Sequence, residues 1–216
     1  QFDRKLENEA TKLLFGTSSE GVELYFTSNR LTYRHDEVIP TTPSSVSPTK
    51  GETPSPSGKT KEGLEEERKP MKFISHYLSV EWMDANPNAE IVAEEPVSFY
   101  YTYGGEGKDA NTTIKANAYK KIIYKNIYPN IDVEYVFPEN KNGIKYSLIL
   151  HPGANPAEIK MKYEGAENTF IDSDGNLIIK SHFGDFIDHA PKTFYKDNGK
   201  LIVSSFSINK NIISFS

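Results

Sequence analysis

Residues 74–82 read ISHYLSVEW, and this stretch decides the fold class. The even positions from Ile74 to Trp82 are mainly apolar, whereas the positions between them hold two serines, a tyrosine and a glutamate. Successive side chains of an extended chain point to opposite faces, so this alternation predicts a long β-strand with one face toward a core.

Strand-like segments of the same kind recur on both sides of this stretch, separated by turn-forming Asn, Asp, Gly and Pro. The expected strands cover residues 22–26 and 31–33, which form a hairpin, and residues 90–93, 97–103, 118–124, 131–137, 143–150, 159–163, 176–181, 185–189, 200–208 and 211–216. Only residues 155–160 and the first dozen residues favour helix, and strands do not alternate with helices. The sequence therefore predicts an all-β fold, a twisted antiparallel β-sandwich.

Residues 40–70 interrupt this pattern with a segment rich in Pro, Ser, Thr and Glu. The segment contains six of the 13 prolines and only two apolar residues, Val46 and Leu64. Such a composition buries too little apolar surface to offset the entropy cost of ordering the chain. We therefore expect one β-rich domain over residues 1–216, with residues 40–70 as a low-complexity insert on its surface. The strand-like end at residue 216 leads us to expect that the domain is the N-terminal part of a longer chain.

Charge and residue usage exclude several classes of function. The net charge is −5, which provides no overall basic field for nucleic acid. The chain has no cysteine, which removes disulfides, thiolate nucleophiles and cysteine-ligated zinc. No apolar window reaches the roughly 18 residues of a transmembrane helix. Known nucleophile and metalloprotease motifs are also missing. We therefore predict a non-enzyme without cofactor.

Two polar clusters contain residue types that can bind metal ions. His182, Asp185, Asp188 and His189 lie close in sequence, but strand geometry sends Asp188 to the face opposite Asp185 and His189, which favours a solvated hairpin edge. A turn at Gly184 would be needed to bring His182 and His189 together. Residues 172–176 read DSDGN, which resembles part of a calcium loop but lacks its distal glutamate, so a hairpin turn is the preferred interpretation. The sequence predicts no metal site.

Residues 99–103 read FYYTY and precede a glycine-rich stretch, residues 104–107. A strand that packs into the core is the preferred interpretation of these aromatic residues. The alternative is an aromatic platform on which a sugar ring stacks, beside a loop that orients its hydroxyl groups. The residues of this possible ligand surface are Tyr100, Tyr101, Tyr103, Glu106 and Lys108.

Several motifs in order resemble a known family. They are ANPNAEI at 85–91, YKKIIYKNIYPNIDVEY at 119–135, GIKYSLILHPGANP at 143–156, YEGA at 163–166, DGNL at 174–177 and AP at 190–191. Together they resemble the N-terminal β-rich domain of large Bacteroidota surface proteins secreted by the type IX system, which often precedes seven-bladed β-propeller-type repeats and a C-terminal sorting domain. The chain departs from that family at residues 108–117, which lack the usual tryptophan.

The resemblance implies export to the cell surface or outer membrane, or release outside the cell. It also implies a non-catalytic interaction module in secretion, adhesion or gliding, whose partners are other envelope proteins or downstream domains of the same chain. It supplies no catalytic residues. A carbohydrate-binding or accessory module of a glycan-processing surface protein remains the alternative, carried by the tyrosines after Phe99.

Overall fold

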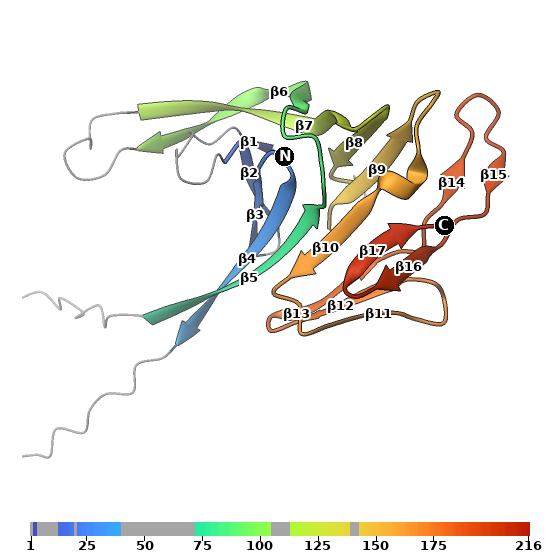
Figure 1. The fold of residues 1–216 in the computed structure, drawn as a ribbon. Helices are drawn as coiled ribbons and strands as arrows, with labels where there is room; N and C mark the ends of the chain where they lie inside the picture. The colour runs from blue at the N-terminus through green and yellow to red at the C-terminus, as the bar shows by residue number, and fades with distance from the viewer. Residues whose placement is uncertain (1, 4–12, 20, 40–71, 105–112, 139–142) are drawn as a thin grey trace, which may run out of the picture.

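A computed structural model describes residues 2–3, 13–19, 21–39, 72–104, 113–138 and 143–216. These residues form antiparallel β-structure, which confirms the predicted all-β class (Figure 1). The predicted surface insert, residues 40–70, lies outside the described residues, as do Glu106 and Lys108. Among the described residues, no helix has the length and apolar character needed to span a membrane.

The largest sheet has twelve strands, and eleven of them follow the order β16-β17-β10-β5-β4-β3-β2-β1-β7-β8-β9, with β6 also paired to β7. The strands are β1 (Phe2–Asp3), β2 (Phe15–Ser19), β3 (Val22–Phe26), β4 (Arg30–Ile39), β5 (Lys72–Trp82), β6 (Glu90–Gly104), β7 (Thr113–Tyr128), β8 (Ile131–Val136), β9 (Lys145–Leu150), β10 (Lys160–Glu164), β16 (Phe206–Asn209) and β17 (Ile212–Phe215).

Two smaller sheets complete the fold. One contains β11 (Asn168–Ile171), β12 (Leu177–Ser181) and β13 (Gly184–Asp188), and the other pairs β14 (Thr193–Phe194) with β15 (Leu201–Ile202). The β14–β15 hairpin lies at the right edge of the view, away from the β6–β7 ribbon at the top left (Figure 1).

The decisive stretch, residues 74–82, lies in β5 as predicted, and its residues Leu78, Val80 and Trp82 are buried. Some expected boundaries are wrong. Residues 90–93 and 97–103 belong to one strand, β6, with a bulge between Pro96 and Tyr100. Strand β4 extends to Ile39 because it pairs with β5 along its whole length. The expected strand at residues 200–208 is divided into β15 and β16.

The helical expectations are also corrected. Within residues 155–160 only a three-residue 3₁₀ helix forms, Pro156–Glu158, and the Asn155 side chain caps it by accepting the amide hydrogen of Ala157. In the first dozen residues, Phe2 and Asp3 form strand β1, and residues 4–12 lie outside the described part of the chain.

A buried aromatic cluster joins strands that are distant in the sheet order. The indole Nε1 of Trp82 on β5 donates a hydrogen bond of 2.8 Å to the hydroxyl of Tyr135 on β8. The Tyr135 ring also meets Phe26 on β3 edge-on, with 5.3 Å between ring centroids. Six pairings separate β5 from β8 along the sheet order, so the sheet folds back on itself and encloses its core as a sandwich does.

A bulge in β7 is held by one buried carboxylate. Asp132 Oδ1 accepts the backbone N–H of Asn126 at 2.8 Å, and Oδ2 lies 3.3 Å from Lys125 Nζ and 3.0 Å from His151 Nε2. Burial opposes ionisation of Asp132, but these three donors outweigh it and hold the pKa of the carboxyl below its ordinary value. The ionised side chain thereby stabilises Asn126 at a φ of 51°.

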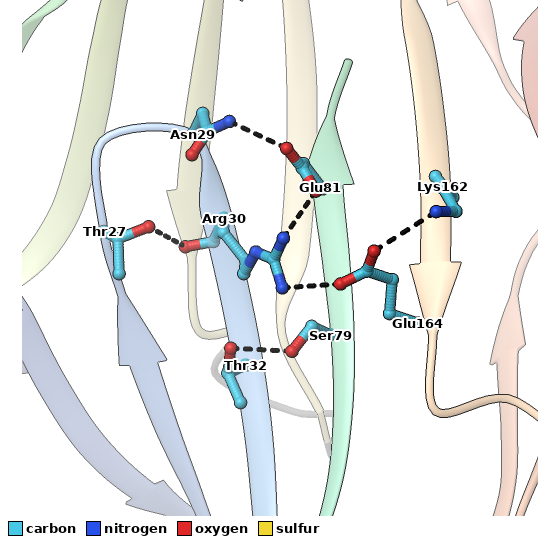
Figure 2. Close-up of polar contacts among 8 residues, drawn as sticks. All are labelled: Thr27, Asn29, Arg30, Thr32, Ser79, Glu81, Lys162 and Glu164. Carbon is cyan, nitrogen blue, oxygen red and sulfur yellow. Dashed lines mark hydrogen bonds and ion pairs between the residues drawn. The ribbon is translucent and has the colours of Figure 1, made fainter. Parts of the chain in front are cut away.

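On the outer face of the sheet, a charge-balanced network joins β4, β5 and β10 (Figure 2). Arg30 lies between two carboxylates, with 2.5 Å from Nη2 to Glu81 Oε2 and 2.7 Å from Nη1 to Glu164 Oε2. Lys162 Nζ lies 3.2 Å from the other oxygen of Glu164. Every charge has a partner of opposite sign, so the network fixes the three strands to one another and leaves no excess charge for a ligand.

The aromatic cluster yields a stability prediction. Tyr135→Phe removes the acceptor of the Trp82 indole and leaves a buried N–H without its partner. We expect the free energy of unfolding to fall by about 1–3 kcal/mol in urea titrations followed by tryptophan fluorescence. Tyr195→Phe, at an exposed tyrosine, is the control and should change it by less than about 0.5 kcal/mol. Equal effects of the two substitutions would contradict the assigned role of Tyr135.

Candidate functional site

Strand β6 lies at an edge of the large sheet. Among the described strands it pairs only with β7, so the peptide groups along its other side are not engaged in a ladder. Its first half carries Glu90, Glu94, Glu95 and Pro96, which are the residue types that protect edges against further pairing. Its second half, residues 97–104, reads VSFYYTYG and contains no charge. The unprotected half of the edge is therefore the aromatic one.

Three aromatic side chains of this half are exposed. Phe99, Tyr100 and Tyr101, called here the aromatic edge, are 47%, 52% and 39% exposed. The preferred interpretation of these residues as core is therefore wrong. The β6 residues that pack against the core are Ile91 and Ala93, in the first half of the strand, before the bulge.

Contacts within the β6–β7 ribbon order the aromatic edge. The Lys115 ammonium on β7 lies over the Tyr100 ring, 4.7 Å from its centroid, a cation–π contact. The rings of Phe99 and Tyr101 meet edge-on at 5.9 Å on the opposite face of the ribbon. Tyr103 continues strand β6, while Glu106 and Lys108 of the predicted ligand surface lie outside the described residues. The aromatic edge is therefore an exposed surface on a strand that, among the described strands, pairs on one side only.

The polar cluster at residues 182–189 does not converge. Asp185 pairs with Lys180 across the β12–β13 hairpin, and His189 is exposed, as the solvated-edge interpretation predicts. His182 turns instead toward β5, where its ring centroid lies 4.3 Å from that of His76. Asp188 is mostly buried, and its Oδ2 accepts a hydrogen bond of 2.7 Å from the hydroxyl of Tyr146. The interpretation as a solvated edge is therefore wrong for Asp188.

The residues of the possible calcium loop form a turn, as predicted. Asp172 Oδ1 accepts the backbone N–H groups of Asp174 and Asn176, both at 2.9 Å, and its Oδ2 accepts the Asn176 amide at 3.0 Å. Strands β11 and β12 pair on either side. Both oxygens of the Asp172 carboxylate therefore accept hydrogen bonds within the turn that closes the hairpin.

A model for a domain of unknown function, DUF7948, matches residues 5–216 of the chain. The chain belongs to this family. No curated protein and no solved structure matches it. The DUF7948 match assigns no activity.

One further set of side chains in the described part of this DUF7948 domain has metal-ligating chemistry. Glu37, His76 and His182 each offer one ligand atom, and these atoms lie within 4.8 Å of one another. The three residues are far apart in sequence and come from β4, β5 and the β12–β13 turn. Sequence reasoning missed the group because no local spacing connects its members.

The buried acid Asp188 is the other feature of the domain that sequence reasoning missed. Burial raises the pKa of its carboxyl to about 6, against smaller opposing effects of the Tyr146 hydrogen bond and of His189. Burial together with the Asp188 charge also raises the pKa of Tyr33 and of Tyr163. In the local sequence, only strand alternation indicates that Asp188 is buried, because it places Asp188 on the face opposite Asp185 and on the same face as Phe186.

The raised pKa of Asp188 predicts that the stability of the fold depends on pH. Because its pKa is higher in the folded than in the unfolded chain, its favourable contribution is complete below about pH 4 and is lost as the pH rises through about 6. Asp188→Asn stays neutral, so its stability relative to the natural chain should rise between pH 4 and pH 8 by up to about 3 kcal/mol. Urea titrations at both pH values measure this difference.

The matched control is Asp185→Asn on the same strand, whose carboxylate is exposed. It should show a much smaller change between the two pH values. If the difference in free energy of unfolding between Asp188→Asn and the natural chain stays constant with pH, Asp188 is not a buried acid with a raised pKa.

Proposed function

We propose that the chain is a non-catalytic interaction module of an exported envelope protein, displayed at the cell surface as part of a type IX-secreted protein. Its binding surface is the aromatic edge of β6, and its partner is an extended segment of another envelope protein, which adds a strand beside β6. The observation that carries this proposal is an uncharged half-strand in which Phe99 and Tyr100 are exposed, at the edge of the large sheet, where β6 pairs only with β7 among the described strands.

Strand addition uses both properties of this edge. Backbone N–H and C=O groups of β6 supply a ladder that any extended chain can complete, and the aromatic side chains supply contact area and selectivity. Tyr and Phe lose little side-chain entropy on binding and are common in interface cores. Because residues 97–104 carry no charge, we expect the added segment to present apolar or aromatic side chains and no net charge at this position.

The polar groups of the described residues favour a binding role over catalysis. Asp132 holds the β7 bulge, Asp172 closes its own hairpin, and Arg30 is shared between two glutamates. These three side chains are engaged in contacts that hold the fold together. The aromatic edge, by contrast, has no structural task in the core.

The proposal predicts capture of an envelope protein from native outer membranes. The natural chain, immobilised and incubated with detergent-solubilised membranes, should retain a specific envelope protein. Tyr100→Glu combined with Tyr101→Glu should lose it, because two carboxylates would be buried against the added strand. Tyr195→Glu is the matched control, since Tyr195 is 53% exposed and Tyr100 is 52% exposed.

Recovery of no envelope protein across several detergents would contradict the proposal. Equal recovery by the β6 double variant and the natural chain would show that any partner binds elsewhere, and would remove β6 as its site.

A glycan-binding module is the second candidate, and the exposure of Tyr100 with Lys115 over its ring favours it. A sugar ring would stack on Tyr100 while Lys115 donates hydrogen bonds to hydroxyl groups. On a glycan array, the natural chain should then bind and Tyr100→Ala should lose binding, with Tyr195→Ala unaffected. An array without hits, or binding that survives Tyr100→Ala, removes this candidate.

A further inference from the structure

We propose that Glu37, His76 and His182 form a binding site for a divalent transition metal, specifically Zn²⁺, which clamps the three-stranded sheet onto the β4–β5 ribbon. The inference is independent of the function proposed for β6, because the two sites share no residue.

The register of β4 and β5 prepares the first two ligands. His35 lies directly opposite His76, and Glu37 lies opposite Ile74, so all four side chains share one face of the ribbon. The same face carries Leu31, Leu78 and Val80 in the core further along the strands. His35, Glu37 and His76 thus lie on the same face of the β4–β5 ribbon as the core residues, nearer the end of the ribbon that is more exposed.

The turn between β12 and β13 covers this end and brings the third ligand. Ser181 Oγ closes the turn with a 2.6 Å hydrogen bond to the Gly184 carbonyl. Phe183 stacks on His35, with 5.6 Å between ring centroids and 13° between planes. These contacts hold the turn against the ribbon, so that His182 lies over His76. Three of the five histidines in the sequence therefore meet at one junction between two sheets.

The distances suit a single ion. Ligand atoms bound to a tetrahedral Zn²⁺ at about 2.0–2.2 Å lie about 3.3–3.6 Å apart. His76 Nε2 and Glu37 Oε2 are already 3.3 Å apart. The whole set lies within 4.8 Å, so the remaining approach is a side-chain adjustment. The side chains of Glu37 and His182 are 57% and 65% exposed, which leaves them free to make it.

The donor set selects the metal class. Two imidazoles and a carboxylate match the ligands that Zn²⁺ prefers, whereas Ca²⁺ and Mg²⁺ need sets built from oxygen atoms. A second carboxylate stands nearby, since Glu167 Oε1 lies 3.7 Å from His182 Nδ1. Two glutamates give the junction negative charge, which attracts a cation.

Isothermal titration of the untagged chain with ZnCl₂ tests the site, with CaCl₂ as a parallel titration. We expect saturable binding of one Zn²⁺ per chain, no comparable binding of Ca²⁺, and a rise of the thermal midpoint on addition of Zn²⁺, because the ion binds only the folded junction. His182→Ala, in an exposed turn, and Glu37→Gln should each weaken binding by about tenfold or more.

His189→Ala is the matched control, because it removes an exposed histidine from the same hairpin region without touching the group. Its Zn²⁺ affinity should equal that of the natural chain, and circular dichroism should confirm that every variant is folded. The site is overturned by absence of saturable Zn²⁺ binding, by unchanged affinity in His182→Ala, or by equal loss in His189→Ala. Ca²⁺ binding of similar strength would also overturn it.

Discussion

The hydrogen bond between the Trp82 indole and the Tyr135 hydroxyl is the contact on which the arrangement of the large sheet depends. It joins β5 to β8, which the strand order separates by six pairings, and therefore requires the sheet to fold over its own face. Both groups are buried, so neither could lose its partner without a substantial cost. Phe26, Tyr124 and Tyr146 pack edge-on or tilted around these two rings and fix the distance between the two halves.

Because the sheet closes over this aromatic cluster, some segments of its strands are buried and others remain exposed to solvent. In β7, Ile122, Tyr124 and Ile127 belong to the core, and the first half of β6 packs against it, whereas the aromatic edge in the second half of β6 is exposed. The same closure leaves the far end of the β4–β5 ribbon uncovered until the β12–β13 turn packs there through Phe183 and Phe186. The proposed interaction surface and the proposed metal site thus lie on two different strand pairs of the large sheet, β6–β7 and β4–β5.

Sequence alternation was sufficient for the fold class and for most strands, because it reports which face of a strand is buried. It identified residues 74–82 and the turn at Asp172 correctly. Alternation does not show which strand lies at an edge, so it wrongly predicts that the aromatic residues after Val97 pack in the core. Nor could it bring Glu37, His76 and His182 together, because strand pairing over long sequence separations places them. The environment of Asp188 is not predictable for a related reason, because its hydrogen-bond partner, Tyr146, comes from another strand.

Among the described strands, β6 is an edge strand that pairs only with β7 and carries exposed aromatic residues. Hydrogen–deuterium exchange of the isolated chain at low concentration measures whether this edge is open. We expect slow exchange for amides of β5, β8 and residues 121–124 of β7, and fast exchange for the amides of residues 97–104 that face away from β7. Protection of all amides in residues 97–104 equal to that of β8 would show that the β6 edge is already covered, and would contradict its role as an open binding edge.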